Sequence, residues 1–487
     1  MNLWAESDNL ELASRPPQQT KKPGTGVGTR FMASPNAIVP ALRAWLLADY
    51  VAPYCRSLAA TRIFRRCFWI DAPGGTRNAA KKAGESQARE EPHPYILDDL
   101  TQTAGHSERS EESHGPASEI LRCAQNDTGR RTDQLEHSSS HPNKAAKKAR
   151  PETLPPALQS VVALADELAR ESKPITLQGI ALDNGKVGKV ENTFVLPKES
   201  GVVNSSWREA APALLPAIEQ FAAIFLLNPL AITKQSSSNL KVKEIPFLTI
   251  DELAPLVQRT APTELCLLLM HRQVETTFLP ALRTPAGASA FTALLRSDRW
   301  KALLAQESER APRVDKAIDL WLASLQPHFL FVQRMAFPML VGPATVEDAP
   351  CSLIFATRRQ DSLGCMNDAV CSYRRRLEQE SYRGILNEAW FAAQQAERDA
   401  QAMQELSEDT LRTGRARSPR RWSDLRQQLL LDRFGQWMLR EYDEVICRLL
   451  QADEVRCQWR QPNNNGEPCR VPGNDDMLQW QWKKRRY

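Results

Sequence analysis

The residues best suited to hold a ligand follow a short apolar run at 67–70. The run ends in Asp71, and the glycine pair Gly74 and Gly75 comes three residues later, so we interpret it as a buried strand that enters a tight loop. Because glycine has no side chain, the backbone of such a loop can approach a dinucleotide or an adenosyl ligand closely. Pro73 is unfavourable there, since it fixes φ and has no N–H to donate. An ordinary strand-ending turn is the alternative interpretation.

A ligand of this kind also needs a carboxylate at a neighbouring strand end, because its ribose presents two hydroxyls. Asp183 is the candidate, since it follows the alternating apolar and polar residues of 175–182, a pattern that is typical of a strand. The sequence Asp-Asn-Gly at 183–185 is also a strong turn signal. A ribose-binding acid and a turn-forming acid therefore both remain open for this position.

The histidines and cysteines do not form a metal-binding or disulfide pattern. Ten cysteines are scattered without a CxxC pair, so we expect reduced thiols and neither a zinc ribbon nor a disulfide framework. Cys365 and Cys371 are six residues apart and would lie roughly 120° out of line on a helix. His271 follows an apolar run, and we expect a partly buried, hydrogen-bonded side chain there rather than a general base.

Clusters of basic residues flank the last part of the chain. Lysine and arginine supply most of the sequence-independent affinity for nucleic acid through phosphate contacts. We therefore predict nucleic-acid or partner contacts for Arg415, Arg417, Arg420, Arg421, Lys483 and Lys484. Tryptophans near these clusters can stack on bases, although packing inside a small module explains them as well. A nucleic acid and a protein partner both remain open.

Length and composition limit the class of protein. A chain of 487 residues allows roughly two to four domains, and 42% hydrophobic with 25% charged residues excludes a fibrous or wholly disordered chain. The net charge of +5 is small, so only local clusters can indicate nucleic acid. No apolar run reaches the roughly 20 residues of a membrane-spanning helix, and the first residues do not resemble a signal peptide. We therefore expect a cytoplasmic protein without membrane contact.

Alternating helices and strands must position the strand-end residues. Apolar residues at three- and four-residue spacing predict helices, and short apolar runs predict buried strands. We expect helices at 37–58, 155–168, 207–220, 249–259, 315–325 and 362–374, and strands at 67–70, 175–182, 221–232, 264–270, 329–332 and 351–356. Thr249 and Glu252 have the spacing of a capping box. Strands separated by helices imply a parallel, doubly wound α/β sheet of the Rossmann-like type.

Composition divides the chain into five parts. We place them at 1–35 (flexible arm), 36–76 with 151–400 (Rossmann-like domain), 77–150 (insertion), 401–421 (basic linker) and 422–487 (terminal module). The arm is rich in Pro, Gly and polar residues. The insertion buries too little apolar surface to offset its ordering entropy, so we expect disorder there. Its segment 107–129 also resembles a translated DNA repeat.

The terminal part predicts a small winged-helix-like module. Amphipathic patterns indicate helices at 422–434 and 437–450. An alternating strand follows from Val455, and a Pro-Asn-Asn-Asn-Gly turn then returns the chain at Cys469 and Val471. Two helices and a hairpin of this kind can dock either a nucleic acid or a protein.

Four segments resemble a known family, the three-Cys-motif partner proteins. They are RRCFWIDAPGGT at 65–76, FLLNPLAI at 225–232, APCSLIFATRRQDSLGCMNDAV at 349–370 and FGQWMLREYDEVICRLLQADEVRCQW at 434–459. The third segment, an Ile-Phe-Ala-Thr strand that leads to a Gly and a Met-containing helix, and the fourth are the more specific ones. The glycine loop alone is a weak signal. The match extends over the chain in patches.

The resemblance implies a methyltransferase-type Rossmann fold, a C-terminal winged-helix domain and a partner protein that bears three cysteines. The cofactor would be S-adenosylmethionine, bound by Asp71, Gly74, Gly75 and Asp183. Asn228 stands where the family has an acid before Pro, and it has no titratable carboxylate; a structural Asn-Pro turn is the alternative. The expected function is methyl transfer with a partner protein or on nucleic acid. A catalytically inactive binding scaffold and a decaying reading frame are the alternative hypotheses.

Overall fold

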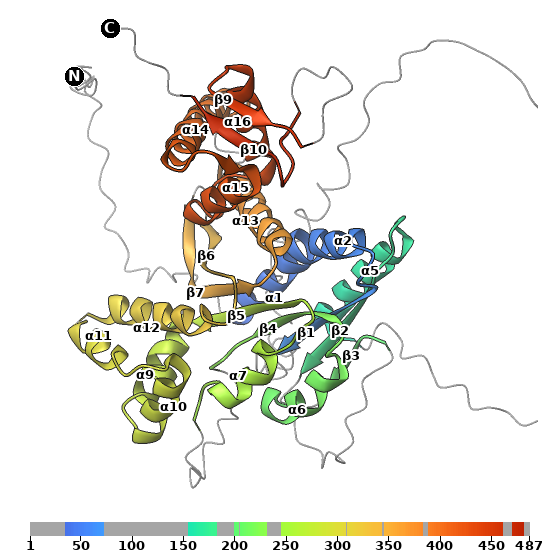
Figure 1. Cartoon of the computed structure of the whole chain (residues 1–487). Helices are drawn as coiled ribbons and strands as arrows, with labels where there is room; N and C mark the ends of the chain where they lie inside the picture. Colours follow the sequence, from blue (N-terminus) through green and yellow to red (C-terminus); the bar gives the residue numbers. More distant parts are fainter. Residues whose placement is uncertain are drawn as a thin grey trace, which may run out of the picture.

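The computed structural model describes residues 35–72, 154–182, 199–203, 205–230, 245–307, 309–342, 345–382, 388–460 and 470–481. The predictions for the N-terminal arm, the insertion, Gly74, Gly75, Asp183, Lys483 and Lys484 lie outside these residues. The described part contains a central sheet, helices on both of its faces and a terminal module (Figure 1).

A seven-stranded sheet in the order β3-β2-β1-β4-β5-β7-β6 forms the centre of the structure. Its strands are β1 (Arg66–Ala72), β2 (Thr176–Leu182), β3 (Gly201–Val203), β4 (Ala222–Leu227), β5 (Thr263–Met270), β6 (Phe331–Gly342) and β7 (Thr345–Thr357). The strands from β3 to β5 are parallel to their neighbours, which confirms a Rossmann-like α/β fold. β7 runs antiparallel to both β5 and β6.

The antiparallel β7 corrects the expectation of a wholly parallel sheet. Residues 343 and 344 alone separate β6 from β7, whereas a crossover between parallel neighbours needs a dozen residues or more. The two strands therefore form a hairpin. Both are also longer than the apolar runs that predicted them. The outer half of β7 contains Glu347 and Asp348, and Gln333 and Arg334 interrupt the apolar run of β6.

Helices cover both faces of the sheet (Figure 1). One face packs against α1 (Pro35–Trp45), η1 (Leu46–Val51), α2 (Ala52–Ala60), α5 (Pro156–Arg170) and α13 (Gln360–Tyr382). The other face packs against α6 (Trp207–Ala217), α7 (Ile250–Val257), η4 (Val274–Phe278), α10 (Pro285–Leu295) and α12 (Arg310–Leu325). Shorter helices are α8 (His271–Gln273), α9 (Leu279–Ala281) and α11 (Trp300–Gln306). Every residue of β4 and β5 is buried, which is why these strands are continuous apolar runs in the sequence.

The last part of the chain forms a module of three helices and a small sheet. Its elements are α14 (Glu388–Ala416), β8 (Arg420–Arg421), α15 (Trp422–Asp432), α16 (Leu439–Gln451), β9 (Val455–Gln458) and β10 (Met477–Trp480). The three strands are antiparallel in the order β8-β10-β9. Figure 1 shows the module on the α13 side of the large sheet, and one continuous hydrophobic core joins the two.

Two expectations about this module are wrong. Residues 401–416 belong to helix α14 rather than to a basic linker, because Ala, Gln, Glu and Arg favour a helix whatever charge they carry. The strand that pairs with β9 is β10, not the segment near Val471, whose side chain is 40% exposed; Cys469 lies outside the described residues. A Cβ on Gly414 would lie 2.1 Å from Trp480. The absence of a side chain at Gly414 therefore lets β10, the strand that pairs with β9, pack closely on α14.

Candidate functional site

The carboxyl ends of β1 and β4 mark the point where the strand order reverses. From β1 the chain continues to β2 and β3 on one side, while β4 and β5 lie on the other. In open α/β sheets, ligands bind outside the carboxyl ends of the strands at such a switch point. Asp71 pairs with Leu226, and the N–H of Asn228 donates to the carbonyl of Ala72 at 3.3 Å. The structure therefore brings Asp71 and Asn228 together at this edge.

Asp71 is held by the helix that precedes its strand. Its side chain is 1% exposed, and its Oδ2 lies 2.7 Å from Nε of Arg43 on α1. Burial raises the pKa of Asp71, and the positive charge of Arg43 opposes this shift. No hydrogen bond from another described residue reaches the two carboxylate oxygens. Asp71 therefore anchors the end of β1, and it retains acceptor capacity for a donor at the edge.

Asn228 forms the turn that ends β4. Its Oδ1 accepts the N–H of Leu230 at 2.9 Å, which is the geometry of an Asx turn. Its Nδ2 donates to Oε1 of Gln273 on α8 at 2.8 Å. The structural Asn-Pro turn that the sequence left open is therefore present, and it also ties the end of β4 to the helix that follows β5.

His271, directly after β5, forms part of a polar chain on the neighbouring strands. Its Nε2 lies 3.0 Å from Oγ of Ser352 on β7. Arg334 on β6 approaches the same hydroxyl at 3.4 Å and makes an ion pair of 2.9 Å with Asp319 on α12. Burial lowers the pKa of His271, and the charge of Arg334 lowers it further. The imidazole is therefore neutral at pH 7 and hydrogen-bonded, as the sequence indicated.

The other predicted cofactor residues follow these strands in the sequence. Gly74 and Gly75 come shortly after the end of β1, and Asp183 directly follows β2. β1 and β2 are parallel, and Asp71 pairs with Ala181, so both strands lead the chain to the same edge. The three residues themselves lie outside the described ranges.

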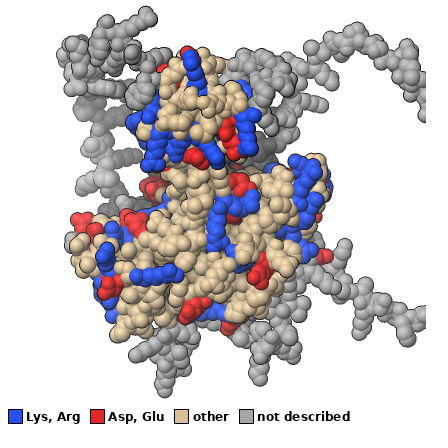
Figure 2. All heavy atoms as spheres, viewed as in Figure 1, with Lys and Arg blue, Asp and Glu red and all other residues tan. Residues whose placement is uncertain are grey.

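The four described arginines of the predicted contact set differ in their surroundings. Arg415 makes an ion pair of 3.0 Å with Glu454, and Arg420 donates to Oε1 of Gln428 at 2.6 Å. Arg417 and Arg421 are exposed. Figure 2 shows acidic and basic side chains interspersed over the module on the face in view. Two of the four described arginines therefore stabilise the module itself, and the other two are available for contacts.

Sequence reasoning missed the contacts that join the module to the large sheet. Asn367 and Asp368 on α13 bind the backbone between α15 and α16: Oδ1 of Asn367 accepts the N–H of Gly435 at 2.8 Å, and Oδ1 of Asp368 accepts the N–H of Leu439 at 2.8 Å. Arg375 adds a two-oxygen ion pair with the carboxylate of Glu441 on α16, at 2.7 and 2.8 Å. The available signal was the Asn-Asp pair at 367–368, which has apolar residues on both sides in the sequence. The segments 349–370 and 434–459 therefore bind each other.

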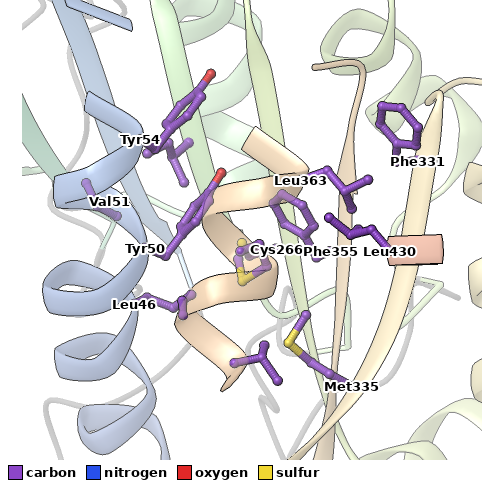
Figure 3. Close-up of a cluster of buried hydrophobic side chains, with 14 of the residues drawn as sticks. Leu46, Tyr50, Val51, Tyr54, Cys266, Phe331, Met335, Phe355, Leu363 and Leu430 are labelled. Carbon is purple, nitrogen blue, oxygen red and sulfur yellow. The ribbon is translucent and has the colours of Figure 1, made fainter. Parts of the chain in front are cut away.

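Glu264, at the start of β5, is a second group that the sequence did not single out. It is fully buried, and its carboxylate accepts hydrogen bonds of 2.6 Å from Tyr54 and from Ser362. Tyr50 is hydrogen-bonded to Ser362 at 2.9 Å, and Figure 3 shows Tyr50 and Tyr54 next to each other beside Cys266. Burial raises the pKa of Glu264 to about 7, although hydrogen bonds from Ser362, Thr357 and Tyr54 lower it. This cluster lies at the amino edge of the sheet, away from the switch point.

No family model, curated protein or solved structure matches this chain. Within the described ranges, no helix combines the length and apolarity that crossing a bilayer requires. In the same ranges, no three His, Cys, Asp or Glu side chains gather as metal ligands.

Proposed function

We propose that this chain is an S-adenosylmethionine-binding protein of the methyltransferase type, similar to the three-Cys-motif partner proteins, and that it acts with a protein partner. The observation that carries the proposal is the reversal of strand order between β1 and β4, with Asp71 and Asn228 at its carboxyl edge. The glycine pair Gly74 and Gly75 follows β1 in the sequence. A closely bound adenosyl ligand requires backbone of this kind at the switch point.

The order of the strands adds support. A dinucleotide-binding Rossmann sheet has the order 3-2-1-4-5-6, whereas here the antiparallel β7 is inserted between β5 and β6. This mixed order is the one that methyltransferase-type Rossmann sheets have. A fold does not define an activity by itself, so the sheet supports the proposal only together with the residues at its edge.

The residues at the edge suit the cofactor. Oδ1 of Asp71 is buried without a hydrogen-bond donor among the described residues, and Oδ2 has only the contact with Nε of Arg43 at 2.7 Å, so a hydroxyl or N–H at the edge would satisfy the carboxylate further. The ion pair with Arg43 fixes the end of β1, and the bond between Asn228 and Gln273 fixes the end of β4. Both walls of the site are therefore rigid before a ligand binds, which lowers the entropic cost of positioning it. The sulfonium of adenosylmethionine supplies an activated methyl group.

One observation favours the second candidate, a binding scaffold without catalysis. Asn228 cannot remove a proton from a methyl acceptor. Both the oxygen and the nitrogen of its amide are already hydrogen-bonded, to Leu230 and to Gln273. A reaction that needs a carboxylate base at the end of β4 would not proceed here, although methyl transfer to an acceptor that is already nucleophilic would.

The terminal module is the proposed docking site for the partner. Its elements follow the order helix, strand, helix, helix, strand, strand, with a sheet order β8-β10-β9, and this order supports the proposal of a winged-helix-like module. In that arrangement α16 is the helix that contacts the ligand. Its exposed side chains include Arg440, Glu444 and Arg448, and Arg448 forms an ion pair with Glu444. A mixed surface of this kind suits a protein partner better than phosphates.

Titration of the full-length chain with S-adenosylmethionine by calorimetry tests the proposal. We expect stoichiometric heat for the natural sequence and its loss in Gly75→Val, because a side chain at that position would block close approach of the backbone. Arg283→Gln, at an exposed arginine, is the control and should bind normally. Absence of heat with the natural sequence would exclude the methyltransferase and leave the scaffold.

A further inference from the structure

A hollow of about 400 Å³ opens at the amino edge of the large sheet, at the opposite end of the strands from the switch point. It lies where β1, β2 and β4 begin, and it is lined by Ile63, Phe64, Arg65, Arg66, Thr176, Gln220 and Phe221. Its volume is in the range of sites that hold small ligands. Its lining combines guanidinium groups, a hydroxyl, an amide and two aromatic rings.

The hollow carries unpaired positive charge. The side chains of Arg65 and Arg66 are exposed, and no Asp or Glu among the described residues forms an ion pair with either of them. The guanidinium of Arg66 lies over the ring of Phe221, with 5.3 Å between its Cζ and the ring centroid. This contact orients the guanidinium while it leaves the N–H groups free to bind an anion.

A buried arginine, Arg259, binds the backbone of Phe221, which lines the hollow. Arg259 is 5% exposed, and its Nη2 donates to the carbonyls of Ile218 and Phe221 at 2.7 and 2.6 Å. Its Nε and Nη1 are buried and have no hydrogen-bond partner among the described residues. Burial lowers its pKa to about 10, so the group remains charged at pH 7. Its guanidinium lies over the ring of Phe225, with 5.4 Å between its Cζ and the ring centroid, and its charge adds positive potential close to the hollow.

The rim of the hollow is apolar and exposed. Ile63 is 76% exposed, more than any other large hydrophobic side chain in the described ranges. It follows Arg62, whose φ of 59° lies in the left-handed region that is unfavourable for a residue with a Cβ. The turn therefore holds Ile63 outward, where it can contact a flat apolar group. Phe64 next to it is partly buried, and the guanidinium of Arg359 lies over its ring at 5.9 Å, so only the rest of this ring can contact a ligand.

We propose that this hollow binds the phosphate of a nucleotide, either free or within a single-stranded nucleic acid. Arginines bind phosphate through paired N–H donors. Aromatic and apolar side chains next to basic ones are the arrangement that holds an unpaired base. Arg65 and Arg66 bind the phosphate, and Ile63 and Phe64 contact the base. The site is separate from the switch point, since the seven residues of β1 extend over about 20 Å.

The test measures binding of AMP, inorganic phosphate and a short oligothymidylate to the full-length chain. We expect AMP or the oligonucleotide to bind more tightly than phosphate alone, with an affinity that falls as salt rises. The double variant R65Q/R66Q should bind about tenfold more weakly or worse, because it loses two charge-assisted contacts. Tight binding of the oligonucleotide and weak binding of AMP would assign the site to a strand, and the converse to a free nucleotide.

Controls separate this site from the rest of the chain. Arg283→Gln removes one charge elsewhere and should leave nucleotide binding unchanged, and melting temperatures verify that the variants fold. Adenosylmethionine should bind R65Q/R66Q as tightly as it binds the natural sequence, so the proposed cofactor site and the proposed nucleotide site can be rejected independently. The inference is overturned if phosphate binds as well as AMP and the oligonucleotide. It is also overturned if a Lys483→Ala/Lys484→Ala variant abolishes binding while R65Q/R66Q does not weaken it.

Discussion

The side-chain amide of Asn367 on α13 binds the backbone around Gly435 through both its oxygen and its nitrogen. Its Oδ1 accepts the N–H of Gly435 at 2.8 Å, and its Nδ2 donates to the carbonyl of Trp437 at 2.7 Å. Asn367 is fully buried, so these bonds are formed away from water. A side chain that follows the last strand of the sheet thereby fixes the connection between the two helices of the terminal module.

The first prediction concerns this connection. Asn367→Ala should lower the free energy of unfolding by about 2 kcal/mol, because it leaves a buried N–H and a buried carbonyl without partners. Chemical denaturation of the full-length chain measures the change. Asn474→Ala, at an exposed turn position, should change stability by less than about 0.5 kcal/mol. Equal midpoints for the two variants would mean that Asn367 does not hold the module.

Gly435 provides the second prediction. Its φ is +74°, and a Cβ there would lie 2.6 Å from Cγ1 of Val370. Gly435→Ala should therefore destabilise the chain by about 1–3 kcal/mol through backbone strain and overpacking. Gly473 has no positive φ, and a Cβ there would be 3.4 Å from its nearest neighbour, Asp476. A thermal melt in which Gly473→Ala is as harmful as Gly435→Ala would contradict the docking geometry.

The third prediction is a pH dependence that originates at Glu264. Its pKa is raised from 4.5 to about 7 by burial, so the folded state favours the protonated carboxyl. The stabilisation is complete below pH 4.5 and is lost as the pH rises through about 7. From pH 5 to pH 8, Glu264 should reduce the free energy of unfolding by about 3 kcal/mol.

Glu264→Gln isolates this contribution, because the amide stays neutral at every pH. Denaturant titrations at pH 5, 6, 7 and 8 measure the free energy of unfolding of the natural chain and of the variant. As the pH rises, this free energy should fall steadily for the natural chain relative to the variant. A difference that is constant with pH would show that Glu264 does not titrate in this window.

The fourth prediction concerns the ion pair at the end of β1. Asp71→Asn should cost about 3 kcal/mol, since it leaves the charge of Arg43 without a partner in a buried position. The double variant Asp71→Asn/Arg43→Leu should cost less than the sum of the single changes. Arg56→Gln removes solvent-exposed ion pairs with Glu167 and Glu171 and should cost less than about 1 kcal/mol. An Asp71→Asn variant as stable as Arg56→Gln would show that the anchor is not formed.

Local patterns were enough to predict much of the fold. β4 is an uninterrupted apolar run, and β1 and β5 contain apolar runs at 67–70 and 265–270, because helices cover both faces of the sheet. The apolar spacing at 37–58 predicts the helical stretch of α1, η1 and α2. Thr249 and Glu252 have the spacing of a capping box, and the Thr249 N–H donates to Glu252 at 2.7 Å.

Contacts between distant parts of the chain were not predictable in this way. Asp71 was expected to contact a ligand, but its partner Arg43 lies on a helix whose pattern shows only which face is buried. Glu264 meets Ser362 across 98 positions of sequence.

The most direct test of the central claim is the place where adenosylmethionine binds. Ultraviolet crosslinking of radiolabelled adenosylmethionine to the full-length chain, followed by peptide mapping, locates it. We predict label in peptides that contain Asp71 with Gly74 and Gly75, or Asn228, at the carboxyl ends of β1 and β4. Label confined to the terminal module or to the amino edge around Arg65, or no competable label at all, would contradict the assignment of the switch point as the cofactor site.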